Sequence, residues 1–195
     1  MKKLIIVASP PASGKTYVSE KLAGKLFSAV YLDKDDLADL VKCAFQIGGQ
    51  CVNMDGAFYA KNIRPAEYST ILNIAFSTLR FADNVILNGP FTKEVRDPAY
   101  MSMLKKRAEA YGAELVLIWV FASAEICHER MIRRAAERDA QKLKNFEEYV
   151  KNIDYSPPYA LEQENSVSRL IVVDARSDEA TEASIVKALE ILKNE

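Results

Sequence analysis

The stretch ASPPASGKT, Ala8–Thr16, decides how the whole chain is interpreted. It overlaps the end of the apolar run Leu4–Ala8 and precedes a segment, from Tyr17 onward, in which apolar residues recur every three or four positions. An uninterrupted apolar run is typical of a strand buried on both faces, and the three-and-four spacing is typical of a helix with one apolar side. The sequence therefore predicts a strand, a loop and a helix in that order.

The second half of this loop has the chemistry of a phosphate-binding loop. Backbone N–H groups at the start of a helix carry partial positive charge and attract phosphate. Lys15 can reach the outer phosphates of a nucleotide, and the hydroxyl of Thr16 can hold Mg²⁺. We therefore expect a nucleotide to contact Ala12, Ser13, Gly14, Lys15, Thr16 and Tyr17.

The loop departs from the usual pattern at Ser9, where a glycine is expected five positions before Gly14. If this position requires a positive φ, serine is less stable there than glycine by on the order of 1 kcal/mol. Pro10 and Pro11 have no N–H to donate, so they shape the turn instead. Because the phosphate donors lie after these residues, we expect the loop to bind a nucleotide despite the substitution.

Five short apolar runs alternate with helical patterns along the rest of the chain. Such alternation predicts parallel strands joined by right-handed crossovers, hence a three-layer α/β domain over residues 1–195 with ligands beyond the carboxyl ends of the strands. The expected strands are Leu4–Ala8, Ala29–Leu32, Val85–Leu87, Leu115–Phe121 and Leu170–Val173.

Composition limits the classes of protein to consider. The 195 residues are 49% hydrophobic and 27% charged, with a net charge of −1, which is ordinary for a globular domain and gives no indication of a nucleic-acid partner. Cys43, Cys51 and Cys127 have no metal-binding spacing and fit a reducing compartment. No apolar run reaches the roughly 18 residues that a membrane span requires. We expect a cytoplasmic protein without a membrane partner.

Acidic residues follow the second expected strand in the sequence YLDKDDL, Tyr31–Leu37. Strand alternation places Asp33 and Asp35 on the same side, at the edge where the phosphates should lie. A carboxylate there can accept a proton from an attacking hydroxyl or help to hold Mg²⁺ through water. A solvated turn before a helix explains the same residues equally simply.

Arginines recur every four residues after the fourth expected strand, at Arg130, Arg134 and Arg138, with Arg133 beside them. On a helix they form one cationic stripe that can spread positive charge over a phosphoryl group during its transfer. Neighbouring glutamates at helical spacing offer the alternative of an exposed ion-pair surface.

These three features together resemble the P-loop kinases of the adenylate-kinase-like group, nearest the branch of polynucleotide kinase, zeta toxins and small antibiotic or sugar kinases. The resemblance covers nearly the whole chain in element order, but only the phosphate loop is a specific motif. It implies a sheet in the order 2-3-1-4-5, ATP as the phosphoryl donor, and a mobile arginine-bearing lid at about residues 130–160.

The resemblance also implies roles for single residues. Asp35 corresponds to the catalytic base, with Asp33 as the second candidate. The candidate metal ligands, Thr16 and Asp33, follow from the chemistry of these side chains given above. Arg176, after the fifth strand, would stack on adenine, although a solvated turn explains it as well. The arginines of the lid would correspond to Arg130, Arg134 and Arg138.

The phosphoryl acceptor is expected at the segment 44–64, where such kinases commonly build this pocket. Phe58, Tyr59 and Arg64 are candidates to line it, and Asn88 lies on a loop that should reach the same cleft. Phe58 and Tyr59 could instead pack in the core.

Two departures from the resemblance bear on function. Asn88 stands where these kinases often carry an acid, which leaves less charge for Mg²⁺, and Ala38 stands where the polynucleotide branch has an arginine. The sequence favours a kinase that uses ATP and Mg²⁺ to phosphorylate a hydroxyl of a small molecule. The alternatives are a zeta-toxin-like or polynucleotide-type kinase, and a nucleotide-binding ATPase or regulator without phosphoryl transfer.

Overall fold

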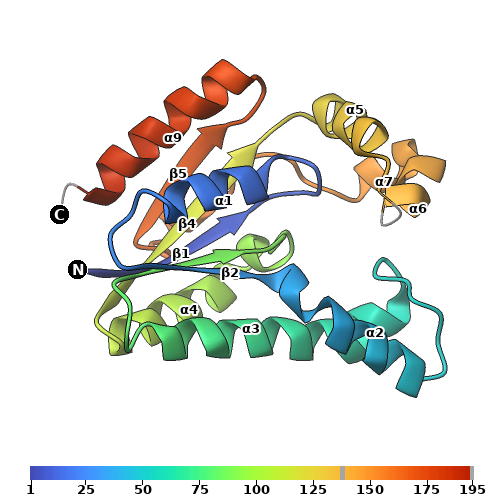
Figure 1. Cartoon of the computed structure of the whole chain (residues 1–195), viewed down its shortest axis with the longest axis horizontal. Helices are drawn as coiled ribbons and strands as arrows, with labels where there is room; N and C mark the ends of the chain where they lie inside the picture. Colours follow the sequence, from blue (N-terminus) through green and yellow to red (C-terminus); the bar gives the residue numbers. More distant parts are fainter. Residues whose placement is uncertain (137–138, 194–195) are drawn as a thin grey trace.

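Five parallel strands form the central sheet in the order β2-β3-β1-β4-β5, which is the order that the resemblance implies (Figure 1). The computed structural model describes residues 1–136 and 139–193. Each of the five apolar runs lies within a strand, so this part of the prediction is confirmed. The strands are β1 (Lys2–Ala8), β2 (Ala29–Asp33), β3 (Asn84–Asn88), β4 (Ala113–Phe121) and β5 (Arg169–Asp174).

Helices cover both faces of the sheet, which explains the continuous apolar runs. Alternate residues of β1 enter different cores: Leu4 and Ile6 lie on one face, whereas Ile5 and Val7 lie on the other. The first face is covered by α3 (Arg64–Thr78) and α4 (Pro98–Ala110), and the second by α1 (Lys15–Ala23) and α9 (Asp178–Lys193).

The remaining helices differ in their distance from this three-layer body. In Figure 1, α2 and α5 to α7 project beyond the end of the sheet at which α1 begins. The other described elements are η1 (Lys34–Leu37), α2 (Ala38–Ile47), η2 (Tyr59–Ile63), η3 (Glu94–Arg96), α5 (Ala124–Arg134), α6 (Ala140–Lys144), α7 (Phe146–Lys151) and α8 (Ala160–Gln163).

The segment 44–64, where the acceptor pocket is expected, combines several kinds of structure. It contains the end of α2, an irregular stretch, and the π-helical turn η2, which leads directly into α3. Phe45, Tyr59 and Ile63 form a small core of their own together with Val41. Within residues 1–136 and 139–193, none of the helices has the length and apolarity needed to cross a membrane.

Candidate active site

The phosphate loop lies between β1 and α1, where the sequence places it. Gly14 has a φ of 105° and Ala12 a φ of 65°. Ser9 has no positive φ, so the strain considered for serine at this position does not arise. Ser9 is instead fully buried, and its hydroxyl hydrogen-bonds that of Ser13. Ser9 therefore stabilises the loop through this internal hydrogen bond. The non-glycine residue of the loop with a left-handed backbone is Ala12.

Two cations contact the main chain of the loop. Lys15 Nζ donates to the carbonyl of Pro10 at 2.9 Å. Arg130 donates from one nitrogen to the carbonyl of Ser13 at 2.9 Å and from the other to that of Ala175 at 2.7 Å. Arg130 thus connects the loop to the turn that follows β5, and its guanidinium lies beside the expected phosphates.

The other arginines of the predicted stripe are placed differently. Arg134 forms a bidentate ion pair with the buried carboxylate of Asp139: Nε lies 2.5 Å from Oδ2, and Nη2 lies 2.7 Å from Oδ1. Arg133 is exposed, and Arg138 lies outside the described residues. Among the described arginines of the stripe, Arg130 is the one bonded to the phosphate loop, and the roles predicted for Arg134 and Arg138 stay predictions.

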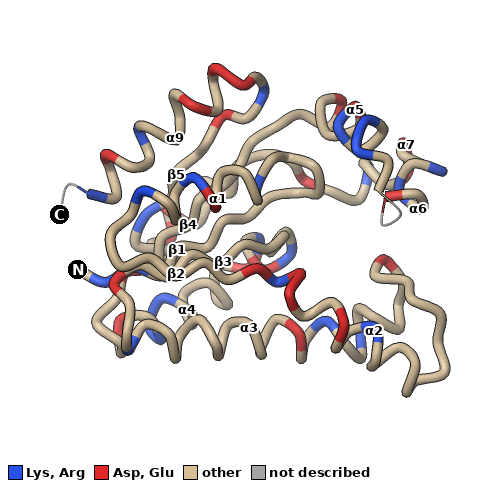
Figure 2. The backbone as a smooth tube through the Cα atoms, in the orientation of Figure 1, with Lys and Arg blue, Asp and Glu red and all other residues tan. Residues whose placement is uncertain are grey.

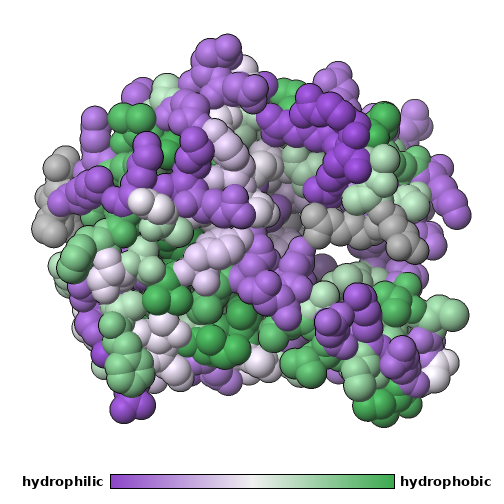
Figure 3. Space-filling model, in the orientation of Figure 1, coloured by the Kyte–Doolittle hydropathy of each residue, from purple (hydrophilic) through white to green (hydrophobic). Residues whose placement is uncertain are grey.

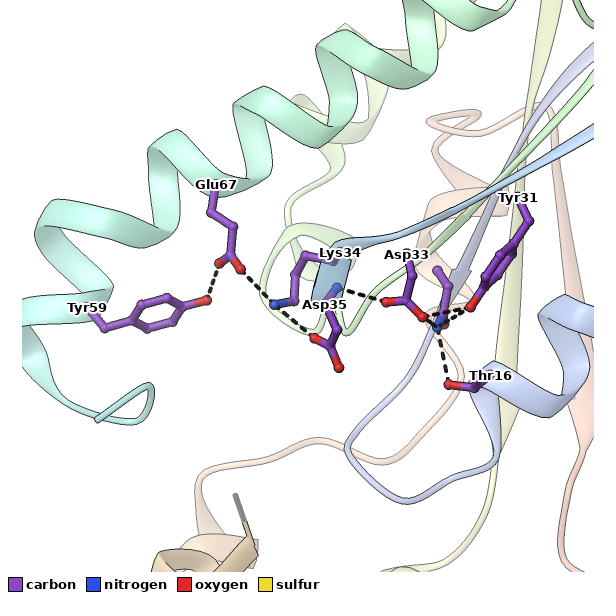
Figure 4. Close-up of polar contacts among 8 residues, drawn as sticks. Thr16, Tyr31, Asp33, Lys34, Asp35, Tyr59 and Glu67 are labelled. Carbon is purple, nitrogen blue, oxygen red and sulfur yellow. Dashed lines mark hydrogen bonds and ion pairs between the residues drawn. The ribbon is translucent and has the colours of Figure 1, made fainter. Parts of the chain in front are cut away.

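A polar cluster joins the ends of β2 and β3 to the start of α1 (Figure 4). The strand register places Asp33 directly opposite Asn88. Asn88 Nδ2 lies 2.7 Å from Asp33 Oδ2, 3.2 Å from the Tyr31 hydroxyl and 3.3 Å from Thr16 Oγ1. The Tyr31 hydroxyl donates to the same Asp33 oxygen at 2.6 Å. The two predicted metal ligands, Thr16 and Asp33, are therefore brought together through Asn88.

These residues fit a Mg²⁺ ion. Mg²⁺ is usually held by one or two carboxylates, waters and substrate phosphates, and Thr16 and Asp33 offer a hydroxyl and a carboxylate. Asn88 Oδ1 is buried and has no hydrogen-bond partner among the described residues, which leaves a further oxygen for the ion or its waters. The part of the chain that the structure describes has no group of three or more His, Cys, Asp and Glu side chains able to hold a metal. At a site with one carboxylate, nucleotide phosphates and waters would complete the coordination of Mg²⁺.

Asp33 and Asp35 have different surroundings. Asp33 Oδ1 accepts the backbone N–H of Asp35 at 2.8 Å, and its Oδ2 accepts from Tyr31 and Asn88. Three of about four acceptor positions of this carboxylate are thus used. Burial, and then the hydrogen bond to Asp33, raise the pKa of the Tyr31 hydroxyl well above its ordinary value, so Tyr31 remains a donor at neutral pH. Asp35 is exposed at the edge of the cluster, 3.2 Å from the ammonium of Lys34.

The residues predicted to bind the acceptor have partners within the protein. The rings of Phe58 and Tyr59 pack on Phe45, with centroids 5.8 and 6.3 Å apart, as the core-packing alternative expects. Arg64 forms a bidentate ion pair with Glu94, with Nη1 2.5 Å from Oε1 and Nη2 2.8 Å from Oε2. An acceptor role for these residues stays a prediction.

Two residues predicted to contact the nucleotide lie at the surface. Arg176 bonds both oxygens of Asp174, at 2.9 and 2.7 Å, and its guanidinium carbon lies 5.6 Å from the ring centre of Phe121. The Tyr17 hydroxyl contacts Glu182 of α9. That Arg176 and Tyr17 contact the nucleotide stays a prediction.

Sequence reasoning did not select Tyr31, Lys34 or Glu67 for this site. Tyr31 had a usable signal, because residues two apart in a strand point to the same side, and Asp33 was already a candidate. Lys34 and Glu67 are 33 residues apart, and no spacing rule connects them.

The opening of the site is bordered by two separate parts of the chain. Figure 3 shows a hollow between the region of α5 to α7 and the region of α2. Lys142 of α6 makes an ion pair with Asp55 of the segment 44–64, with 3.0 Å between Nζ and Oδ2. His128 of α5 stacks on Phe146 of α7 with ring centroids 3.9 Å apart.

The strand order and the Gly-Lys-Thr loop at the start of α1 define the fold of a P-loop kinase, a nucleotide-binding class. A family model described as an AAA domain matches residues 4–154, and the chain belongs to this family. No curated protein matches the chain.

Solved structures with the same fold include small-molecule kinases. A sugar kinase from a Janibacter species has a TM-score of 0.65 at 15% identity, covering 98% of this chain and 95% of that chain. Shikimate kinase from Acinetobacter baumannii, in complex with shikimate, has a TM-score of 0.53 at 16% identity, with 100% and 96% covered. Kti12 from Chaetomium thermophilum, in complex with ADP-AlF3, has a TM-score of 0.60 at 16% identity, with 96% and 97% covered. At these identities the likeness establishes the fold alone.

Proposed function

We propose that the protein is a kinase that transfers the γ-phosphoryl group of ATP to a hydroxyl of a small molecule. The observation that supports this proposal best is the placement of Thr16, Asp33 and Asn88 within one hydrogen-bonded cluster, with Asp35 on the next turn. A phosphate loop alone serves hydrolysis, transfer and switching, whereas an accessible carboxylate beside it suits the removal of a proton from an acceptor.

The phosphate loop would hold the donor. Backbone N–H groups at the start of α1 would bind the phosphates, and Lys15 would leave the carbonyl of Pro10 to contact the outer ones. Arg130 would stabilise charge as it moves onto the leaving group. Thr16 and Asp33, with Asn88, would hold Mg²⁺, which when bound neutralises phosphate charge.

Asp35 would act on the acceptor. As the acceptor oxygen forms its bond to the γ-phosphorus, the bond from that phosphorus to the bridging β–γ oxygen breaks, and ADP leaves with the electron pair. The acceptor hydroxyl proton passes to Asp35. Asp33, whose oxygens already accept three hydrogen bonds, would orient this turn and take part in metal binding.

Asn88 favours a second candidate function, a nucleotide-binding ATPase or regulator. An amide at this position adds no negative charge for Mg²⁺, so transfer chemistry has less support from the metal than with an acid.

The test is to incubate the protein with ATP, Mg²⁺ and a panel of sugars, aminoglycosides and nucleosides, and to measure ADP. We expect ADP release that depends on one acceptor class, with loss of transfer in Lys15→Ala at an unchanged circular dichroism spectrum. ADP release that no acceptor increases would indicate an ATPase, and ATP binding without ADP release would indicate a regulator. Full transfer by Lys15→Ala would refute the assignment.

A further inference from the structure

A chain of buried polar groups ends at Asp35, and none of the roles proposed above uses it (Figure 4). Lys34 Nζ lies 3.2 Å from Asp35 Oδ1 and 2.8 Å from Glu67 Oε1. The other oxygen of Glu67 accepts a hydrogen bond from the hydroxyl of Tyr59. The side chains of Lys34 and Glu67 are 4% and 2% exposed, whereas that of Asp35 is 53% exposed. A buried ion pair therefore borders an accessible carboxylate.

Stability gives little reason for this arrangement. A buried ion pair loses the hydration of both charges, and apolar side chains of similar volume often serve as well or better. Both members of the pair, however, contact a further polar group. Lys34 has two carboxylate neighbours, and Glu67 accepts from both Lys34 and Tyr59. Burial, followed by the hydrogen bond to Glu67, raises the pKa of Tyr59 well above its ordinary value, which keeps this hydroxyl a donor.

The arrangement fixes Asp35 at two points. Its backbone N–H is held by Asp33, and its carboxylate is held by the ammonium of Lys34. Lys34 is in turn held by Glu67 at the start of α3, and Glu67 by Tyr59 of η2. The orientation of Asp35 is thus tied to two elements outside its own turn, one of which belongs to the segment 44–64.

We propose that Lys34, Glu67 and Tyr59 are positioning residues that orient the carboxylate of Asp35 toward the phosphoryl acceptor, an inference that rests on the proposed kinase function. Rates of transfer are sensitive to such placement, since a shift of about 1 Å in a reacting group can lower them about 100-fold. The chain of contacts leads away from the phosphate loop in Figure 4, so ATP binding should not depend on it.

The test compares Lys34→Met, Glu67→Gln and the double variant Lys34→Met/Glu67→Gln with wild type. Lys42→Met is the matched control, because Lys42 forms an exposed pair with Asp39 on α2. The readouts are kcat with the responsive acceptor, the ATP dissociation constant by calorimetry, and the side-chain carboxyl ¹³C resonance of Asp35, assigned with Asp35→Asn. We expect Lys34→Met to lower kcat by about 10- to 100-fold, with an unchanged ATP dissociation constant and a displaced Asp35 resonance.

The double variant keeps the test valid if Lys34→Met does not fold, since it removes both charges of the buried pair and keeps an amide oxygen that can accept from Tyr59. If wild type transfers phosphate and the double variant retains both its kcat and its Asp35 resonance, the positioning role is wrong and the kinase proposal stands. Parallel losses of kcat and ATP affinity would indicate general damage and also overturn the role. If wild type phosphorylates no acceptor, the kinase proposal fails, and the Asp35 carboxyl resonance alone tests whether Lys34 and Glu67 orient Asp35. A displaced resonance in the variants supports this orientation, and an unchanged resonance refutes it.

Discussion

At the scale of single residues, the two candidate carboxylates are distinguished by their exposure to solvent and by their neighbours. Asp33 accepts from two side chains and one backbone N–H, whereas Asp35 is exposed and lies beside an ammonium. A carboxylate whose oxygens are occupied suits a fixed role, such as orienting a turn or a metal. One that faces solvent suits proton transfer with a substrate.

Substitution should separate these two roles. We expect Asp35→Asn to lower kcat by about 10²- to 10⁴-fold, the usual contribution of a general base, without a change in ATP affinity. Asp33→Asn should instead raise the Mg²⁺ concentration that gives half-maximal turnover. Steady-state kinetics with Mg²⁺ titration measures both, and the reverse pattern would exchange the roles of the two residues.

The amide of Asn88 leads to a second prediction at this scale. Asn88→Asp removes the donor that lies 2.7 Å from Asp33 Oδ2 and adds a negative charge in its place. Loss of the donor alone should destabilise the protein by about 1–3 kcal/mol, so the melting temperature without metal should fall. Mg²⁺ with ADP should then raise the melting temperature more than it does in wild type. Melting curves with and without Mg²⁺ test this, and an unchanged Mg²⁺ response would contradict it.

At the scale of elements, the segment around α2 and η2 is held by a small core separate from the two cores that pack on the sheet. Its members are Val41, Phe45, Tyr59 and Ile63. Because few side chains share this packing, the segment should open more easily than the strands.

Phe45→Ala tests the dependence of this segment on its own core. Phe45 is 1% exposed, and removal of such a ring typically costs about 3–5 kcal/mol. We expect faster amide hydrogen exchange over residues 41–63 and unchanged protection in β1 and β4. Leu40→Ala, at a position 68% exposed on the same helix, is the control and should leave exchange unchanged. Loss of protection throughout the sheet would show that the segment does not unfold separately.

The elements were easier to predict than the contacts between them. Strands and the phosphate loop follow from local patterns in β1 and around Gly14, and the strand order followed from the resemblance that those patterns revealed. The contact of Arg130 with the Ser13 carbonyl joins residues 117 apart, and that of Lys34 with Glu67 joins residues 33 apart. Such pairs depend on how elements pack, which hydrophobic periodicity does not specify.

At the scale of the whole molecule, the two sides of the site differ in their balance of charges although the net charge is only −1. Figure 2 shows residues of both signs on each side, with basic residues in excess along α5 and acidic residues in excess over η1 and α2, which follow β2. A nucleotide carries its negative charge on the phosphates, so the basic side suits the donor, and the acidic side suits a group that gives up a proton.

The reactivity of the three cysteine thiols tests whether the folded protein shields Cys127 and exposes Cys43 and Cys51. Burial raises the pKa of the Cys127 thiol to about 11, whereas Cys43 and Cys51 are exposed. The thiolate is the reactive form, so at pH 8 a thiol reagent should modify two cysteines quickly and the third only after denaturation. Because folding raises the pKa of Cys127, this thiol does not oppose folding at neutral pH, and stability should fall as pH rises above the ordinary thiol pKa toward 11. Rapid modification of three thiols in the native protein would contradict this packing.

The ion pair of Lys142 with Asp55 has a consequence for how fast ligands enter. It links the two borders of the opening, so a ligand that needs this passage must wait for the pair to separate. The side chains of Lys142 and Asp55 are 12% and 48% exposed, so added salt weakens this partly buried pair less than it would an exposed one. Entry should therefore become slightly faster at higher ionic strength. This trend is opposite to that of simple attraction between ATP and basic side chains, which salt slows. The sign of the salt effect on the association rate thus reports which of the two processes limits entry.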